Sequence, residues 1–297
     1  MKNIRLILNG KKAGLEPLRA AIFTARKKQA IEVRVTWEAG DVERFVAEAM
    51  TEKVPRLMIG GGDGSVKEVV DALMKYPCKA RPELAILPLG TANDFATACT
   101  IPTEFIDAIS LAQQGKATMV DCIKANDEHF INAASGGFGA KVTTTTPVEL
   151  KNFLGGGAYT LNGLVQALNF TPYQGEIIMP TTTIKDDIIV SAVCNSRQAG
   201  GGQQLAPSAF INDGLIDVVT LHSFPSEELL TVANELLDPE ISGTYVKRYQ
   251  VPWVKWKSSS FIPTNLDGEP IKAKQLHYEV VANAIKLVLP TNCPVLK

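Results

Sequence analysis

The chain of 297 residues lacks the features that would assign it at once to a membrane, secreted or metal-binding class. No apolar run approaches the roughly 18 residues of a membrane-spanning helix, and the run near Met1 is too short for a signal peptide. The five cysteines, at positions 78, 99, 122, 194 and 293, form no Cys-x-x-Cys pair. This odd and scattered set is typical of a reducing compartment rather than of a disulfide framework or a zinc site. We therefore expect a soluble, cytoplasmic protein.

The chain also lacks a clear excess of charge of either sign, and it contains few histidines. Thirty Lys and Arg residues against 31 Asp and Glu residues leave a formal net charge of −1, which argues against a general nucleic-acid binder. The three histidines, His129, His222 and His277, show no metal-ligand spacing. Neither a Gly-x-Ser-x-Gly elbow nor a His-Glu-x-x-His helix occurs, so the hydrolase classes have no support. The 45% hydrophobic content and the length suit one large domain or two moderate ones.

The most informative stretch is Leu57–Glu68, with the sequence LMIGGGDGSVKE. A short apolar run predicts a buried strand that ends in glycines, and apolar residues spaced by three and four from Val66 predict a helix. This arrangement is typical of a phosphate site, because backbone N–H groups can approach an anion and the helix dipole favours negative charge. Asp63 would repel bare phosphate, so we expect a divalent cation to accompany it.

Two familiar glycine loops do not fit this stretch. The dinucleotide fingerprint needs a third glycine where Ser65 or Lys67 stands, and the Gly-Lys-Ser/Thr end of a Walker loop occurs nowhere in the chain. The stretch therefore predicts a phosphate loop of another kind, with a tight turn that binds no ligand as the alternative.

A second glycine turn, Pro88–Asp94, follows the apolar run Leu84–Leu87. Ligands of open α/β sheets bind outside the carboxyl ends of the strands, so the two turns are expected to face one crevice. Thr91 could donate its hydroxyl to a phosphate. Asp94 could orient a nucleotide or a metal, or could simply cap the helix that follows.

The order of elements predicts two parts that meet near residue 124. Strands at 4–8, 31–37 and 84–87 and helices at 15–29 and 41–52 accompany the central strand and its helix. From residue 119 onward, short apolar runs separated by turns suit an antiparallel sandwich or barrel. A helical stripe over 147–170 is open to two interpretations, a lipid groove or core packing, and a short helix is expected over 226–237.

Five segments together carry a resemblance to a known family. Gly61–Ser65 resembles the GGDGT signature of the diacylglycerol kinase catalytic-domain superfamily, which also includes sphingosine kinases and, more remotely, NAD kinases. Ser65 stands where the family usually has Thr, and it keeps the hydroxyl. The order and spacing of the motifs are most similar to bacterial YegS-type lipid kinases over nearly the whole chain. The other four segments are Pro88–Phe95, Gln198–Gln204, Asn212–Asp217 and Asn265–Glu269.

The resemblance implies an α/β plus β fold. Residues 1–124 would form a three-layer α/β nucleotide-binding domain of the NAD kinase and diacylglycerol kinase type. Residues 125–285 would form a C-terminal antiparallel β-sandwich that binds substrate and metal. A last strand, 286–297, would return to the first domain.

The same resemblance implies the site residues. Glu269 would be the general base for a substrate hydroxyl, Asp267 would bind metal or hold Glu269, and Asp63 would help to hold Mg²⁺. A second cation, Mg²⁺ or Ca²⁺, would be held by Asp213 and the backbone carbonyls of Phe210 and Leu215. ATP would contact Asn9, Thr36, Gly61, Gly62, Asp63, Gly64, Ser65, Val66, Lys67, Glu68, Thr91 and Asp94.

The predicted function is therefore an ATP-dependent lipid kinase, a transferase of phospholipid metabolism. Its acceptor would be a free hydroxyl of diacylglycerol, phosphatidylglycerol or a sphingoid lipid, met by peripheral and transient contact with the inner face of the membrane. No nucleic-acid partner is expected. Two alternatives stay open: a soluble-metabolite kinase of the NAD kinase or phosphofructokinase type, and a non-catalytic lipid or nucleotide sensor.

Overall fold

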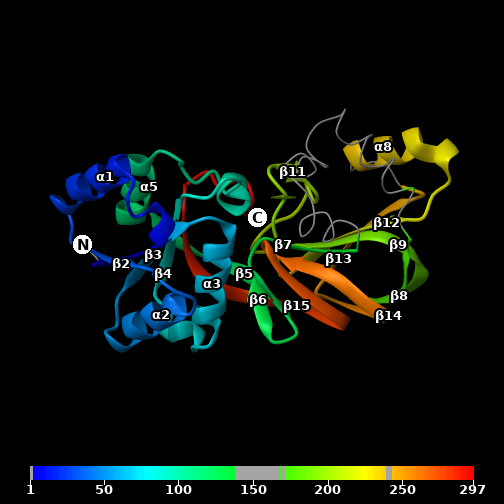
Figure 1. Cartoon of the computed structure of the whole chain (residues 1–297), viewed down its shortest axis with the longest axis horizontal. Coiled ribbons are helices and arrows are strands. Elements are labelled where there is room, and N and C mark those ends of the chain that lie inside the picture. Colours follow the sequence, from blue (N-terminus) through cyan, green and yellow to red (C-terminus); the bar gives the residue numbers. More distant parts are fainter. Residues whose placement is uncertain (1–2, 138–167, 169–170, 239–242) are drawn as a thin grey trace.

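The computed structural model describes residues 3–137, 168, 171–238 and 243–297 (Figure 1). The predicted helical stripe over 147–170 lies almost wholly outside these residues. No helix in the described part of the chain has both the length and the hydropathy that a membrane span requires.

The N-terminal part is built on four parallel strands with helices on both faces (Figure 1). The strands are β1 (Ile4–Leu8), β2 (Ile31–Val35), β3 (Arg56–Gly61) and β4 (Glu83–Pro88), in the order β4-β3-β1-β2. The helices α1 (Glu16–Arg26) and α5 (Phe105–Gln114) pack on one face, and α2 (Asp41–Thr51) and α3 (Asp63–Met74) pack on the other. All five residues of β1 are buried, because the helices cover both faces of the sheet.

These elements confirm the strands and helices predicted for this part, with shifted ends. The first helix ends at Arg26 rather than near residue 29. Gly40, not Asp41, is the N-cap of α2, and the Asp41 carboxylate instead accepts N–H bonds from Trp37 and Glu38. Helix α5 lies in a stretch to which the sequence pattern assigns no separate element.

The C-terminal part is dominated by antiparallel strands. Helix α8 (Leu229–Leu237) lies close to the predicted helical segment 226–237. A buried cluster that includes Phe130, Trp256 and Tyr278 forms its main core. The strands are β5 (Lys116–Ala125), β6 (Glu128–Phe130), β7 (Ala133–Gly137), β8 (Tyr173–Ile178), β9 (Thr183–Cys194), β10 (Gln198–Ala199), β11 (Gln203–Gln204), β12 (Ile216–His222), β13 (Val246–Val251), β14 (Trp253–Leu266) and β15 (Glu269–Leu289).

One strand joins the two parts. The 21 residues of β15 pair with β14 and β5, and near its end Leu287 pairs with Leu84 of β4 in the parallel sense. Within the described residues, the strands of both parts therefore form one hydrogen-bonded sheet, apart from β10 and β11, which pair only with each other. The strand expected over 286–297 is the end of β15 and stops at Leu289, after which the Ile211 N–H donates to the Val295 carbonyl at 2.9 Å.

Candidate active site

The two glycine turns touch each other. Strands β3 and β4 are neighbours, and the Leu89 N–H donates to the Gly61 carbonyl at 2.9 Å. A Cβ atom on Gly90 would lie 2.6 Å from the Cα of Gly62, so the two backbones are in direct contact. Asn93, with a φ of 52°, closes the second turn by accepting the Gly90 N–H at 2.8 Å. The two turns therefore form one continuous edge at the carboxyl ends of β3 and β4, where the common crevice is expected.

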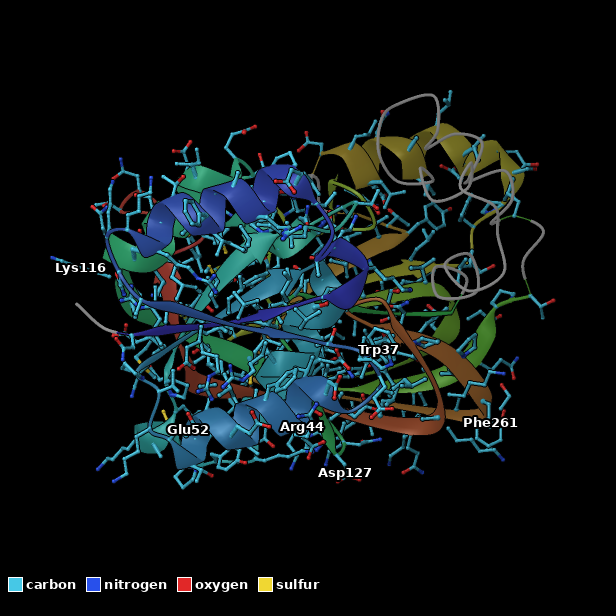
Figure 2. The ribbon with its side chains drawn as sticks, turned by 60° about the vertical axis from the view of Figure 1, so that its left-hand side comes forward. Trp37, Arg44, Glu52, Lys116, Asp127 and Phe261 are labelled. Atoms are coloured by element: carbon cyan, nitrogen blue, oxygen red, sulfur yellow. The ribbon has the colours of Figure 1, made fainter. Side chains whose placement is uncertain are left out.

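Hydroxyl and amide side chains gather around this edge. The Asn9 Nδ2 lies 3.5 Å from the Ser65 Oγ, which packs against Gly61. The Thr36 Oγ1 accepts the Gly10 N–H at 3.1 Å and so ties the end of β2 to the end of β1. Thr91 is exposed. Next to Thr36, the Trp37 side chain is 93% exposed (Figure 2).

Asp63 is the first residue of α3 and lies beside the start of α4 (Asp94–Ala98). Its Oδ1 accepts the Phe95 N–H at 3.2 Å. Burial raises the pKa of Asp63, the nearby Asp94 carboxylate adds to the rise, and the Phe95 N–H opposes it. A carboxyl group placed near other negative charges is a fitting ligand for a cation, which would stabilise its ionised form.

The residues that follow Ser65 are less suited to binding through their side chains. Val66 is buried in the core against the sheet, and the Lys67 ammonium pairs with Glu128 of β6. The Glu68 side chain is exposed. In this stretch, the groups suited to bind an anion are the backbone N–H groups in the first turn of α3, because they lack intrahelical acceptors.

Asp94, which is predicted to orient a nucleotide or a metal, makes its hydrogen bonds to a glycine turn in the C-terminal part. Its carboxylate, 5% exposed, accepts the N–H groups of Gly201 at 2.9 Å and Gly202 at 2.7 Å. These two glycines and Gly200 all have positive φ and form the turn of the β10–β11 hairpin. Asp94 therefore fastens this glycine hairpin to the first turn of α4.

Asp267 occupies the turn between β14 and β15. Its carboxylate accepts the N–H groups of Ile131, Asn132 and Ala133 at 2.7–3.1 Å. Burial raises the pKa of Asp267 to about 7, the three N–H donors oppose the rise, and the Asp63 charge adds to it. Asp267 thus anchors the turn rather than facing solvent.

Glu269, two residues further on, is exposed and faces the phosphate loop. Its Oε1 lies 3.3 Å from the position that a Cβ atom on Gly64 would occupy. Partial desolvation raises the pKa of the Glu68 carboxyl group, and the Glu269 charge adds to that rise. The structure therefore brings Glu269 to the first turn of α3, although 204 positions separate it from Ser65 in the chain.

The segment around Asp213 is held by hydrogen bonds to Asp121, a residue that the sequence motifs did not indicate. The Asp121 carboxylate, 1% exposed, accepts the Gly214 N–H at 2.8 Å and the Asn283 N–H at 2.7 Å. An Asp inside the apolar run Val120–Ile123 was the available sequence signal, because a buried charge needs partners.

The predicted cation site at this segment has a single carboxylate from Asp213, whose Oδ1 accepts the Leu215 N–H at 3.1 Å. Burial raises the pKa of nearby Asp217 to about 6. Across the described residues, no three His, Cys, Asp or Glu side chains cluster closely enough to hold a metal by themselves. A cation here would depend on the carbonyls of Phe210 and Leu215, a donor set that suits hard ions.

Comparisons with known proteins agree with this architecture. Residues 3–125 match the family model of the diacylglycerol kinase catalytic domain, and residues 132–289 match that of the YegS C-terminal NAD kinase beta sandwich-like domain. A diacylglycerol kinase structure from Bacillus anthracis has the same fold, with a TM-score of 0.74 at 20% identity over 98% of both chains. The fold is thus that of a two-domain kinase with a diacylglycerol kinase catalytic domain.

Relatives with higher sequence identity show which family of these kinases the chain belongs to. A "probable lipid kinase YegS-like" from Shewanella frigidimarina is 48% identical over 100% of this chain and 96% of its own length. One from Yersinia enterocolitica is 44% identical over the full length of both chains. This chain belongs to the YegS-like lipid kinase family, which confirms the resemblance carried by the sequence motifs.

Proposed function

We propose that this chain transfers the γ-phosphoryl group of ATP to a free hydroxyl of a lipid at the edge formed by the two glycine turns. The observation that carries the proposal is the contact between Glu269 and Gly64, which joins the C-terminal part to the first turn of the phosphate-binding helix. Phosphoryl transfer needs neutralised phosphate charge, an in-line hydroxyl and an acceptor for its proton. Family membership supports the reaction type.

The phosphates of ATP would lie against the backbone of Gly61, Gly62 and Gly64. The hydroxyls of Ser65 and Thr91 and the amide of Asn9 surround the same backbone and can donate hydrogen bonds to phosphate oxygens. Thr36 and the end of β2 would contact the rest of the nucleotide. Asp94 would act indirectly, because its carboxylate holds the glycine hairpin.

The acidic residues fit a divalent cation. Lys67, the lysine that follows the loop in the sequence, is paired with Glu128, so little positive charge from this segment reaches the phosphates. When bound, Mg²⁺ would neutralise phosphate charge, and Asp63 would be its protein ligand. The site around Asp213 would hold a second Mg²⁺ or a Ca²⁺.

Glu269 would accept the proton of the lipid hydroxyl as the new phosphorus–oxygen bond forms. Asp267 would keep the turn that carries Glu269 in place through its three backbone hydrogen bonds. Diacylglycerol, phosphatidylglycerol and sphingoid bases all offer a suitable hydroxyl. Because such acceptors reside in membranes, the enzyme would act from the cytoplasm by peripheral contact.

We also propose the finer division of the fold that the motifs imply. Residues 1–124 would be a three-layer nucleotide-binding domain of the NAD kinase and diacylglycerol kinase type, to which the end of β15 returns. Residues 125–285 would be the antiparallel sandwich domain. The two family models support this division, since they meet between residues 125 and 132.

The test is transfer of radiolabelled γ-phosphate from ATP with Mg²⁺ to vesicles of mixed bacterial lipids. Glu269→Gln should lower the rate at least a hundredfold while ATP still binds, because a general base contributes about 10²–10⁴. Glu279→Gln, an exposed position on the same strand, is the matched control and should keep full activity. Label in a soluble metabolite instead of lipid would favour the soluble-kinase alternative. Equal activity of the Glu269→Gln variant would refute the proposed base.

A further inference from the structure

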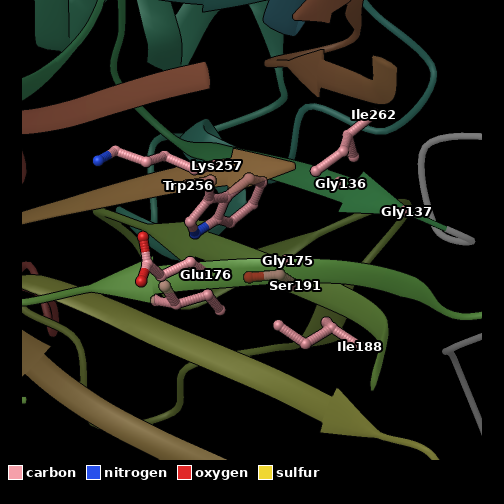
Figure 3. A pocket seen from close by; sticks show the side chains of 10 residues that line it. Gly136, Gly137, Gly175, Glu176, Ile188, Ser191, Trp256, Lys257 and Ile262 are labelled. Atoms are coloured by element: carbon pink, nitrogen blue, oxygen red, sulfur yellow. The ribbon is translucent and has the colours of Figure 1, made fainter. Parts of the chain in front are cut away.

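The end of β2 carries the most exposed large hydrophobic side chain that the structure describes. The Trp37 ring is 93% exposed (Figure 2), whereas the other two tryptophans of the chain are covered. Trp253 packs edge-on against His277, and Trp256, 4% exposed, lines a hollow of about 30 Å³ between β7 and β8 (Figure 3). A large aromatic surface left in water is unfavourable, so Trp37 favours a ligand that covers it.

Trp37 lies on the sheet edge where the phosphates of ATP are proposed to bind. Leu8 of β1 pairs with Gly60 of β3 on one side and with Val35 of β2 on the other. The residues that follow these three strands therefore lie side by side, and the ends of β3 and β2 are two strand spacings apart, about 10 Å. A nucleotide whose phosphates lie at the glycine turn would extend its ribose and base toward the end of β2.

The backbone that carries the Trp37 ring is held in place. The Asp41 Oδ2 accepts the Trp37 N–H at 2.6 Å and the Glu38 N–H at 3.1 Å, and Asp41 is 3% exposed. The Thr36 N–H donates to the Leu8 carbonyl at 2.9 Å. The ring thus projects into solvent from a fixed backbone, which lowers the entropy that binding a ligand would cost.

The same hydrogen bonds use the backbone N–H donors of residues 36–38. A base at this position would find a ring face to stack on, but no free backbone donor from these three residues for its ring nitrogens or its carbonyl oxygen. Stacking on an aromatic side chain tolerates different bases, because every base has a π-face.

We propose that the Trp37 indole stacks on the base of the bound nucleotide and that this contact gives the enzyme its affinity for a purine nucleotide over a bare polyphosphate. The inference rests on the proposed kinase function and adds to it the recognition of the base. Because the base lies away from the transferring phosphoryl group, the contact is the same in the ground state and the transition state. Trp37 would therefore set the KM for ATP and leave kcat unchanged.

The test compares ADP and GDP with pyrophosphate, which has no base, in binding to the wild type and to Trp37→Ala in the presence of Mg²⁺. The variant should bind both nucleotides about 10–100-fold more weakly, the effect of about one stacked base, and pyrophosphate equally well. In lipid phosphorylation its KM for ATP should rise by the same factor while kcat stays within about twofold. Trp37→Phe keeps an aromatic ring and should lose less affinity than Trp37→Ala.

Tryptophan fluorescence gives a second readout. Since Trp37 is the exposed one of the three tryptophans, ADP should quench its emission or shift it to shorter wavelength. Trp37→Phe should still bind ADP but lose this change in emission.

Phe23→Ala is the matched control, because Phe23 is also an exposed aromatic residue, at 66%. It lies near the end of α1, which begins after the carboxyl end of β1 and ends before the amino end of β2, so it is remote from the nucleotide edge. This variant should keep the ADP affinity and the emission change of the wild type.

The inference would be overturned by ADP binding without a change in wild-type emission, by unaltered ADP affinity in Trp37→Ala, or by an equal loss of pyrophosphate affinity. GDP binding more than about a hundredfold weaker than ADP would also overturn it, because hydrogen bonds would then read the base. An emission change with anionic lipid vesicles but not with ADP would assign Trp37 to membrane contact instead. A wild type that binds neither ADP nor pyrophosphate would refute the proposed function itself, so the two failures are distinguishable.

Discussion

Replacing Gly90 by alanine tests whether the two glycine turns act together. The added methyl carbon would lie 2.6 Å from the Cα of Gly62 and 2.7 Å from the Asn93 Oδ1. Non-bonded carbon atoms are most favourable at about 3.5–4.0 Å, so the two turns would have to separate by about 1 Å. A misplacement of about 1 Å at a reacting site costs about a hundredfold in rate. We expect Gly90→Ala to lower kcat/KM for ATP about a hundredfold, while overpacking lowers stability by about 1–3 kcal/mol.

The assay is γ-phosphate transfer to lipid over a range of ATP concentrations, together with thermal unfolding of the same preparation. Gly14→Ala is the control, because a Cβ atom there would meet nothing within 4 Å. The control should match the wild type in both measurements. If folded Gly90→Ala keeps kcat/KM within threefold of the wild type, the two turns do not jointly position the phosphates.

Three carboxylates give further predictions. Asp267→Asn should lower Tm by about 5–10 °C, because its amide leaves one or two of the buried backbone donors unpaired, and a smaller change would mean that these bonds do not hold the turn. Asp94→Asn should speed amide hydrogen exchange at Gly201 and Gly202 about 10–100-fold, whereas unchanged rates would show that the hairpin is held by other contacts. The Trp37 N–H, the Arg44 guanidinium and the Glu38 N–H lower the pKa of Asp41 to about 2 in the folded state, against about 4 when unfolded. Its stabilising effect is therefore present above pH 4 and is lost as the pH falls toward 2, so Asp41→Asn should lower Tm at pH 7 but not near pH 2.

Short-range patterns in the sequence predicted the N-terminal part well. The strand that ends at Gly61 and the helix that begins at Asp63 follow from an apolar run, a glycine turn and a period of three to four residues. The same kind of signal located the second turn at β4 and the turn that carries Asp267 and Glu269. These features are encoded within a dozen residues, so neighbours in the chain are sufficient to specify them.

The partners of individual side chains depended on contacts between distant segments. Asp94 has the sequence context of a ligand or a cap, yet its carboxylate binds Gly201, 107 residues away. Asp267 could have faced a metal, but it accepts N–H bonds from a segment about 135 residues earlier. Which atoms satisfy a buried carboxylate is decided by packing, and local sequence does not carry that information.

The sequence by itself determined the motifs, their order, the parallel strands that present them and the family. Only the tertiary structure decided that β15 joins both parts in one sheet, that Glu269 meets Gly64, and that β7 and β8 leave a hollow between them. The physical reason is the range of the interactions. Periodicity and turn chemistry act over a few residues, whereas strand pairing and side-chain packing bring together residues that are far apart in the chain.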